Sequence, residues 1–456
     1  MNGVQITTPF EKLEAEGGKY EEIKNATKAG VDIKTDVTND SDTEATGVSV
    51  KSTVYNKEGD VVSTQTDDIT VAAGKTETIS QSVDVANPKL WSVDSPNLYW
   101  VRTEIIQNGK VVDSTDSRFG IRYIATDPNS GFYLNGVHTK LNGVCEHSDL
   151  GSLGMETYQA AVDRRIRTLK KYGVNAIRTS HNPVSPEFIE ACDRLGMLVF
   201  EEAFDQWLYS KNSDDYHNYF NKAADGKTVV FDKAGNDNTN NDTSYIEVKR
   251  DDLQSNAERD IKAMVERDKN APCIFAWSTG NEIYDARYKH GENTLDMLTG
   301  WIKEIDTTRP VAACPPTWDN YWANNAQQEK HLAKAEMSGF NYATGQYDGA
   351  HSRYPNMVIF GSETVSAYYY RGVYFLEGEG SSDRCNEYPT YWTFSSATAS
   401  LEAHRDKTYT AGEFVWTGHD YLGEPTPRSW PSKSSYFGMI DTAGFAKDVV
   451  YMYKSM

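Results

Sequence analysis

The first part of the chain alternates apolar and polar residues. Between residues 31 and 122, runs such as VDIKTDV, VSVKSTVY and TETISQSVDV place apolar side chains largely at every second position. A period of two is typical of strands with one buried face, and polar clusters such as TNDSDTE and NKEGD separate the runs as turns do. The pattern predicts an antiparallel β-sandwich over residues 1–125, in which residues 1–25 form an edge strand and a weakly patterned lead-in.

Beyond residue 125 the pattern changes, and short apolar runs alternate with longer helical patterns. This alternation indicates βα units around a parallel sheet. Eight such runs, with helical patterns after most of them, predict a (β/α)8 TIM barrel over residues 126–456. The predicted strands are 138–146, 175–181, 197–204, 273–282, 310–316, 337–342, 357–364 and 412–420.

The connections between these runs contain recognisable helices and one insertion. Helices are predicted at 155–173, 185–196 and 251–268, and the first of them has Gly173 where a helix commonly stops. We expect residues 205–248 to be an insertion, because the polar run GNDNTNNDTS at 235–244 is typical of a loop.

Polar residues gather directly after the predicted barrel strands. In (β/α)8 barrels these strand ends face one common pocket, where the chemistry is found. The same placement at seven of the eight ends predicts a functional site there. The residues concerned are Cys145, Glu146, His147, Arg178, Ser180, His181, Asn182, Glu201, Glu202, Asp205, Asn281, Glu282, Asn341, Tyr342, Glu363, Trp416, His419 and Asp420.

Two of these residues suit a specific chemistry. Glu282 ends the apolar fourth strand, and Glu363 ends the apolar seventh. Glycoside hydrolysis needs a pair of carboxyl groups, one to protonate the leaving oxygen and one to meet the positive anomeric carbon. A separation of ~5–5.5 Å would give a retaining mechanism through a covalent glycosyl-enzyme. The alternative for either residue alone is a salt-bridged position on the rim.

The neighbouring strand ends offer groups that could support such a pair. Asn281 could donate a hydrogen bond to a sugar 2-hydroxyl, or cap a turn. Arg178 and Tyr342 could hold a nearby carboxylate ionised, or form packing contacts. We interpret His147 and His181 as donors to sugar hydroxyls, since no spacing supports zinc. Trp416 could form an aromatic floor under a sugar ring, or pack in the core.

Composition excludes some classes of function. Lys and Arg number 46 and Asp and Glu 66, so the formal net charge is −20 and nucleic-acid binding is not expected. The chain is rich in aromatic residues, with 28 Tyr, 16 Phe and 10 Trp, which suit both sugar binding and large cores. No apolar stretch approaches the ~20 residues of a membrane helix, so we expect a soluble protein without membrane partners.

The cysteines and the N-terminus give no sign of secretion. Met1–Phe10 has neither a basic region nor an apolar core, so no signal peptide is visible and a cytoplasmic location is slightly favoured. The chain has five cysteines at wide spacings without a C-x-x-C motif, and four are expected to be small buried hydrophobic residues. These four are Cys145, Cys192, Cys273 and Cys314.

The sequence resembles glycoside hydrolase family 2, which includes β-galactosidases and β-glucuronidases. The resemblance runs in order through all eight predicted strands and covers most of residues 127–456. The segments NPKLWSVDSPNLYWV and DSRFGIR resemble the immunoglobulin-like domain that precedes the barrel in this family. The matching barrel stretches are LNGVCEHSDLG, IRTSHNP, EEAF, WSTGNE, GFNY, FGSET and FVW.

The resemblance implies a role for each matching residue. It makes Glu282 the acid/base and Glu363 the nucleophile of a retaining exo-β-glycosidase. Arg178 and Tyr342 are implied to orient the nucleophile. The implied substrate contacts are His147, His181, Asn281, Tyr342, Trp416 and, through galactose hydroxyls, Asp205.

The chain departs from the family pattern in two respects. Members usually begin with a jelly-roll sugar-binding domain, which would end near Met1, and often continue past the position of Met456. We therefore expect a fragment or a short member. The magnesium ligands of the large bacterial β-galactosidases would fall at Gln206 and Leu208, which cannot form that site, so no metal or other cofactor is implied.

The choice of sugar rests on the end of the chain. β-Glucuronidases of the family use an Asn-x-Lys motif there to bind the substrate carboxylate. Residues 431–453 lack it and look more like the β-galactosidase form, so we expect hydrolysis of terminal β-D-galactosides. A β-glucuronidase is the alternative, because Lys433 and Lys447 could meet a carboxylate. A non-catalytic carbohydrate-binding fragment is the third interpretation, and self-association into a homo-oligomer stays open.

Overall fold

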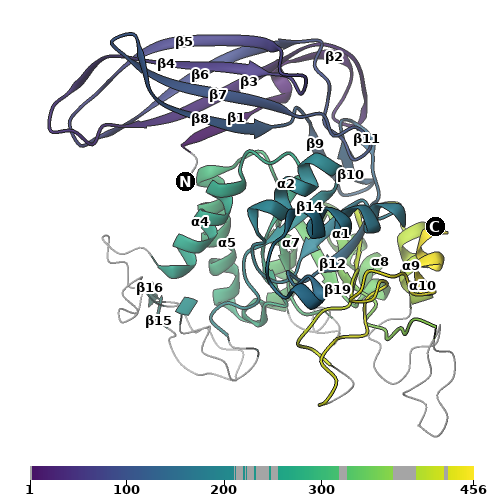
Figure 1. Cartoon of the computed structure of the whole chain (residues 1–456). Helices are drawn as coiled ribbons and strands as arrows, with labels where there is room; N and C mark the ends of the chain where they lie inside the picture. The colour runs from purple at the N-terminus through teal and green to yellow at the C-terminus, as the bar shows by residue number, and fades with distance from the viewer. Residues whose placement is uncertain are drawn as a thin grey trace, which may run out of the picture.

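The N-terminal part of the molecule is a sandwich of two antiparallel sheets (Figure 1). In one sheet β3 pairs with β1, β2 and β6, and the other has the order β5-β4-β7-β8. The predicted β-sandwich is confirmed. Its strands are β1 (Val4–Thr7), β2 (Leu13–Gly18), β3 (Glu21–Thr38), β4 (Ala45–Tyr55), β5 (Val61–Val71), β6 (Thr76–Ala86), β7 (Tyr99–Gln107) and β8 (Lys110–Phe119). The computed structural model describes residues 3–209, 211, 219–220, 222, 231–232, 246–247, 255–317, 326–372, 397–425 and 430–455.

The residues expected to form a lead-in belong to the first sheet. Val4 and Ile6 of β1 are buried in the sandwich core, and their partners in β3 are Thr35 and Ile33. β2 pairs with the first half of β3, but its side chains are exposed or half-exposed. An exposed edge strand needs no apolar face, so the sequence pattern does not show it.

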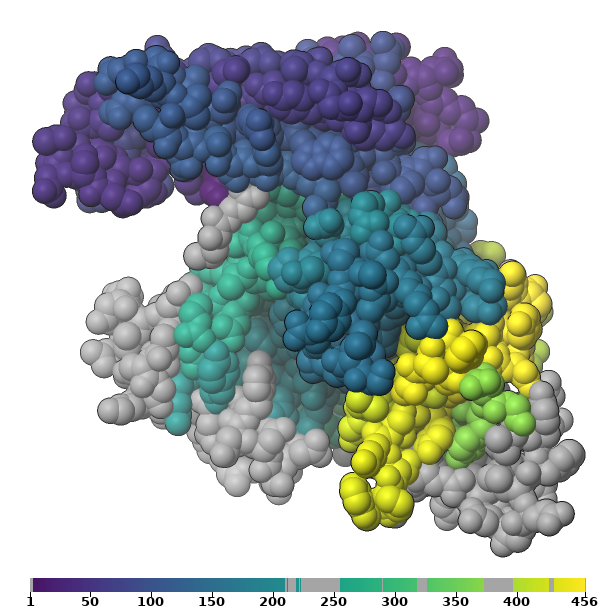
Figure 2. Space-filling model, viewed as in Figure 1, coloured from purple at the N-terminus to yellow at the C-terminus, as the bar shows by residue number. Residues whose placement is uncertain are grey.

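The sandwich is joined to the barrel by buried polar contacts. Arg118 of β8 donates two hydrogen bonds to Asp193 Oδ2, and Trp91 Nε1 donates to the backbone oxygen of Asp193. Asn270, which precedes a barrel strand, exchanges two hydrogen bonds with the backbone of Val4 and Ile6. The sandwich therefore lies across the end of the barrel at which the strands begin (Figures 1 and 2).

Eight parallel strands close into a barrel, which confirms the predicted fold class. The predicted boundary after residue 125 falls inside β9, the first strand of a small antiparallel sheet that precedes the barrel. That sheet consists of β9 (Ile124–Asp127), β10 (Gly131–Leu134) and β11 (Val137–His138). The barrel strands, in order, are β12 (Leu141–Glu146), β13 (Ala176–Thr179), β14 (Leu198–Glu202), β17 (Ile274–Asn281), β18 (Val311–Cys314), β19 (Met337–Asn341), β20 (Ile359–Thr364) and β21 (Gly412–Val415).

The barrel interior is filled by aromatic side chains. Phe200, Phe275, Phe360 and Phe414 come from four strands, and their ring centroids lie 5.4–6.3 Å apart in the contacting pairs. Phe132 of β10 contacts Phe275 at 5.3 Å, on the side of the small sheet. Because the interior is a packed core, a pocket for a ligand must lie at the opposite end, beyond the last residues of the strands.

Helices surround the barrel, and local sequence signals set their ends. α2 (Pro186–Leu195) begins after Ser185, whose side chain accepts from Phe188 N, and ends at Gly196 in the left-handed conformation. The other helices are α1 (Gln159–Lys171), α4 (Asn256–Asp268), α5 (Lys289–Ile305), α7 (Ala326–Lys334), α8 (Tyr347–Arg353), α9 (Ala397–Asp406) and α10 (Val449–Lys454). Short 3₁₀ turns are η1 (Phe10–Lys12), η2 (Gly151–Leu153), η3 (Tyr284–Arg287) and η4 (Thr344–Gln346).

Three further sequence expectations can be compared with these elements. The helices predicted at 155–173, 185–196 and 251–268 correspond to α1, α2 and α4. The insertion holds a short pair, β15 (Phe231–Asp232) and β16 (Ile246–Glu247), whereas the loop expected at 235–244 lies outside the described residues. Cys145, Cys192, Cys273 and Cys314 are free and buried, as expected.

Among the described helices, none has the length and apolar character to cross a membrane.

Candidate active site

The polar strand ends meet at the mouth of the barrel, away from the sandwich (Figure 1). The two carboxylic acids predicted to act together, Glu282 and Glu363, come from the ends of β17 and β20. Both are contacted by the side-chain amide of Asn341, at the end of β19. Its Nδ2 lies 3.3 Å from Glu282 Oε1 and 3.4 Å from Glu363 Oε2, so these oxygens are separated by at most the sum, 6.7 Å.

The two carboxyl groups sit in different electrostatic surroundings. Burial, and then the nearby charge of Glu363, raise the pKa of Glu282 from 4.5 to about 7. Glu363 is instead held by donors on both oxygens: Tyr342 donates its hydroxyl to Oε1, and Arg178 Nη1 lies 3.0 Å from Oε2. Glu282 is therefore suited to carry a proton near neutral pH.

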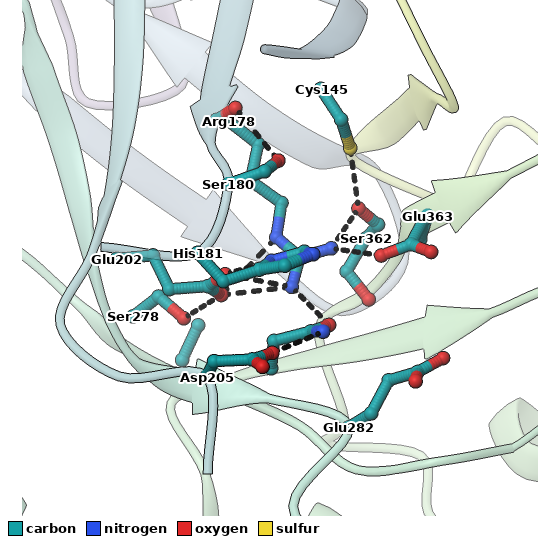
Figure 3. A network of polar contacts seen from close by, with 12 residues as sticks. Cys145, Arg178, Ser180, His181, Glu202, Asp205, Ser278, Glu282, Ser362 and Glu363 are labelled. Atoms are coloured by element: carbon teal, nitrogen blue, oxygen red, sulfur yellow. Dashed lines mark hydrogen bonds and ion pairs between the residues drawn. The ribbon is translucent and has the colours of Figure 1, made fainter. Parts of the chain in front are cut away.

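Arg178 stands between two carboxylates in the centre of the site, as Figure 3 shows. On the side away from Glu363 it binds Glu202, with Nη2 2.8 Å and Nε 3.2 Å from Oε2. His181 Nδ1 lies 2.7 Å from the other oxygen of Glu202, and Ser278 Oγ donates to Oε2 at 2.6 Å. Burial opposes the charge of Glu202, but Arg178, His181 and Ser278 together keep its pKa below the ordinary value.

Asn281 is held in one orientation by charges on both sides. Its Oδ1 accepts from Arg178 Nη2 at 2.8 Å, and its Nδ2 donates to Asp205 Oδ1 at 3.1 Å. Lys211 Nζ is also 2.8 Å from Asp205 Oδ1. Burial disfavours the charged form of Asp205, yet Lys211 and His181 outweigh it and lower its pKa to about 2. Within the described part of the chain, Asn281 Nδ2 donates one hydrogen to Asp205, and its second amide hydrogen could serve a ligand hydroxyl, as its predicted role requires.

A wall of rings closes the site near strands β12, β13 and β21. His147 contacts Trp416, His181 and Tyr421, with centroids 5.3, 5.8 and 4.2 Å away. Burial, followed by the neighbouring His181, lowers the pKa of His147 to about 3, so this ring is neutral at ordinary pH. A neutral imidazole can donate and accept one hydrogen bond each, which suits hydroxyl groups.

Trp416 is less open than a floor for a sugar ring requires. Its side chain is 6% exposed, and its ring is stacked on His181 with an interplanar angle of 4° and centroids 5.4 Å apart. One face of the indole is therefore occupied by a protein ring. Its role as the floor of a sugar subsite stays a prediction, since the contacts of Trp416 in the structure are with the rings of His147, His181 and Tyr421.

Two residues of the catalytic region have positive φ angles. Glu282 and Tyr342 have φ angles of 44° and 53°, in the left-handed region that residues other than glycine rarely adopt. Such residues concentrate at functional sites, where the surrounding structure holds them in place. Both residues directly follow the end of a barrel strand. The backbone N–H of Tyr342 donates to the backbone oxygen of Glu363 at 2.7 Å.

The positions of the magnesium ligands in the large bacterial β-galactosidases do not fit a metal in this chain. Leu208 is buried and has no donor atom, and the side-chain oxygen of Gln206 accepts a hydrogen bond from Lys211 N at 2.9 Å. A hard cation needs several oxygen ligands. Across the described ranges, no group of three or more His, Cys, Asp or Glu residues is placed to hold a metal ion.

The structure brings the predicted site residues into one region, whereas the strand-end residues Glu146, His419 and Asp420 have other partners. His419 pairs with Glu146, and Asp420 pairs with Lys447, in a buried cluster beside α1. The sequence assigned no role to Glu202 or Asn341, although both were recognised as polar strand ends. The signals available in the sequence were the second acid of the run EEAF, which is Glu202, and the amide in GFNY, which is Asn341.

A (β/α)8 barrel whose mouth holds two carboxyl groups on one shared amide, one of them with a pKa near neutrality, has the arrangement of a glycoside hydrolase. A family model described as the TIM barrel domain of glycosyl hydrolases family 2 matches residues 127–328, and a second model of the same family matches residues 19–122. The chain belongs to glycosyl hydrolase family 2.

Known relatives agree in family and differ in activity. A β-galactosidase of Bacteroides ovatus is 33% identical over 94% of this chain and 51% of its own length. A β-glucuronidase of Bacteroides fragilis is 23% identical over 81% of this chain and 49% of its own length. The crystal structure of a family 2 member from Bacteroides cellulosilyticus superimposes with a TM-score of 0.76 at 28% identity, covering 99% of this chain and 49% of that one. The chain thus spans about half the length of these relatives.

Proposed function

We propose that this chain carries the catalytic centre of a retaining exo-β-glycosidase that hydrolyses terminal β-D-galactosides. The observation that carries the proposal is the shared amide of Asn341, which bounds the Glu282 and Glu363 oxygens at 6.7 Å. Retaining enzymes need a separation of ~5–5.5 Å, whereas inverting enzymes need ~6.5–9.5 Å to admit a water. The bound excludes most of the inverting range for this pair of oxygens.

The first step of the proposed reaction divides the work between the two acids. Glu282 donates its proton to the glycosidic oxygen, and the C1–O bond breaks as Glu363 attacks C1 from the opposite face. This attack forms an ester between the sugar and Glu363. Tyr342 and Arg178 position the attacking carboxylate, because Tyr342 donates to one of its oxygens and Arg178 to the other. Asn281 offers its remaining amide hydrogen to the sugar 2-hydroxyl.

The second step releases the sugar with its original configuration. Glu282, now ionised, removes a proton from water, and the water oxygen attacks C1 and displaces Glu363. The free sugar leaves, and Glu282 is protonated again for the next cycle. A pKa near neutrality suits this alternation, because the group must both give and accept the same proton.

The preference for a galactoside is supported by the Bacteroides ovatus β-galactosidase and by the state of Lys447. This lysine was a candidate partner for a uronate, but its side chain is 2% exposed and its Nζ lies 2.7 Å from Asp420 Oδ2. It also donates to the backbone oxygen of Tyr436 at 3.2 Å. A cation already bound in this way is poorly placed to meet a substrate carboxylate.

Turnover of an aryl β-D-galactoside by the purified chain tests the proposal. The products should be followed by proton NMR, which separates the β-anomer formed first under retention from the α-anomer formed under inversion. Glu363→Gln is the paired variant, because it keeps the volume of the side chain and removes the nucleophile. Equal rates for the two proteins would overturn the assignment, and so would an α-anomer as first product.

Two alternative functions can be tested against this proposal. A β-glucuronidase is supported by the Bacteroides fragilis relative, and a higher kcat/KM for an aryl β-glucuronide than for the galactoside would establish it. The other alternative is a non-catalytic carbohydrate-binding role. Galactose binding in calorimetry without turnover of any aryl glycoside would identify that role.

A further inference from the structure

A third carboxyl group stands near the catalytic pair. Glu424 belongs to the segment that follows the last barrel strand, β21, and it accepts a hydrogen bond from the hydroxyl of Tyr421. Tyr421 is buried and packs on His147 and Trp416, with centroids 4.2 and 5.5 Å away. Through this tyrosine, Glu424 is attached to the wall of rings described above.

The backbone around Glu424 is fixed by its own small ladder. Tyr421 and Ser435 exchange backbone and side-chain hydrogen bonds of 2.8 and 3.0 Å, and Gly423 N donates to the oxygen of Lys433 at 3.0 Å. An antiparallel bridge joins Leu422 to Ser434 between these contacts. The position of Glu424 therefore follows from a paired segment and from a buried anchoring ring.

Glu424 interacts electrostatically with two groups of the catalytic site. Burial is the largest cause of the raised pKa of Glu424, and the hydrogen bond from Tyr421 opposes it; repulsion from Glu363 raises the pKa further, while His181 lowers it. Glu424 is half-buried, so these charges interact through protein as well as solvent. A bound sugar next to Glu363 would thus lie within reach of the field of Glu424.

Among the described residues, two cations of the site already have carboxylate partners, and Lys433 lies over the ring of Trp430. Arg178 is shared by Glu202 and Glu363, and Lys211 binds Asp205. A hydroxyl group can donate to a carboxylate, whereas a second carboxylate brought to the same place meets a like charge in a partly dehydrated pocket. Neutral sugars and uronic acids differ in just this group.

We propose that Glu424 is a specificity-determining residue that accepts hydrogen bonds from the hydroxyls of a neutral sugar and repels the carboxylate of a uronic acid. The inference rests on the proposed glycosidase function and deepens it, because it names the substrate class that the site rejects. Tyr421 is the residue that positions it. The proposal needs no metal or additional group, only the negative charge and its location.

Glu424→Gln tests the proposal, because it keeps the size and the hydrogen-bonding capacity of the side chain and removes the charge. The ratio of kcat/KM for an aryl β-glucuronide to that for an aryl β-galactoside should rise about tenfold or more, as expected when a like-charge contact is removed. Glu402→Gln, on the exposed side of α9, makes the same change in net charge and should leave the ratio unchanged. An unchanged ratio in Glu424→Gln, or an equal rise in both variants, would overturn the proposal.

A binding measurement separates this inference from the proposed function. In the Glu363→Gln background, calorimetry with D-galactose and D-glucuronate should show that Glu424→Gln strengthens glucuronate binding about tenfold relative to galactose. This result supports the role of Glu424 even if the chain turns over no glycoside, an outcome that would contradict only the proposed activity. Unchanged relative affinities, or no binding of either sugar, would overturn the role of Glu424.

Discussion

Arg178 Nη1 lies 3.0 Å from Glu363 Oε2, and the arginine side chain has no exposed surface. The same guanidinium also binds Glu202 and Asn281, so one cation of β13 joins groups from β14, β17 and β20. The planar, forked shape of the guanidinium allows these contacts at once, which a single ammonium group cannot reproduce. The position of Glu363 and the integrity of the barrel mouth therefore depend on the same side chain.

Arg178→Lys should lower both stability and activity. Breaking a buried charge network leaves carboxylates without partners and costs about 3–5 kcal/mol. We expect the urea midpoint of unfolding to fall accordingly, and kcat to fall more than KM rises, because Glu363 loses a positioning donor. Arg102→Lys is the matched control, since Arg102 forms an exposed pair with Asp116 in the sandwich. That variant should change stability by less than about 1 kcal/mol, and equal losses in the two would contradict the predicted role of burial.

Removing the nucleophile should allow rescue from the opposite face of the sugar. Glu363→Gly should reduce turnover of an aryl β-galactoside by about a thousandfold or more and leave room for a small anion. Azide bound in that space would attack C1 directly, so the product should be an α-glycosyl azide. Proton NMR of the product checks the prediction. A β-azide from this variant would mean that Glu363 is not the nucleophile.

Removing the acid/base should give the other anomer. In Glu282→Gly the glycosyl-enzyme on Glu363 can still form when the leaving group needs no proton, as with a dinitrophenol. Azide would then replace water in the second step, and a β-glycosyl azide should accumulate. Rates with dinitrophenyl and unactivated alkyl galactosides should diverge in this variant, since the alkyl leaving group depends on a general acid. Equal losses for both substrates would argue against Glu282 as the acid.

The rate should fall on the alkaline side at a pH near neutrality. Glu282 must be protonated to donate, and its pKa of about 7 means that the protonated fraction decreases as the pH rises through that value. We expect kcat/KM to decline by about tenfold per pH unit above it. Glu413 provides a sharp control, because burial also raises its pKa to about 7, although it lies in β21 beside Thr364. Glu413→Gln should keep the alkaline limb, and Glu282→Gln should remove it.

Asn341→Ala should move the alkaline limb of the pH–rate profile to higher pH. Asn341 donates to Glu282 Oε1, and a hydrogen bond to the charged form lowers the pKa of an acid, opposing the effect of burial. Without the donor, the pKa of Glu282 should rise further, so protonation would persist to higher pH. The pH dependence of kcat/KM measures the shift. Asn56→Ala, in a turn of the sandwich, should leave the limb unchanged, and a downward shift in Asn341→Ala would contradict the assigned contact.

Local sequence patterns were sufficient to predict the architecture. The eight apolar runs correspond to β12–β14 and β17–β21, because strands buried on both faces need continuous apolar residues. Ser185 and Gly196 likewise bracket α2, as capping residues do. β2 could not be predicted in this way, since a strand exposed at the edge of a sheet has no periodic signal.

The candidate site was predicted where a strand ends in a reactive side chain, and was missed where the role depends on a partner. Glu282 and Glu363 follow apolar strands, so their position alone indicated the pair. Glu202 acquires its role from Arg178, and Asn341 from the two acids, and the contacts of this network join residues 22 to 185 positions apart. Nothing in the neighbouring sequence encodes such distances.

The sequence by itself determined the β-sandwich and the (β/α)8 barrel and placed two acids at strand ends, because period, strand length and capping are local properties. Only the tertiary structure decided that one amide joins Glu282 to Glu363, that Trp416 stacks on His181, and that Glu424 binds the hydroxyl of Tyr421. The physical reason is that closure of the barrel sets these contacts. Distances, burial and the pKa values that follow from them exist only once distant strand ends share one mouth.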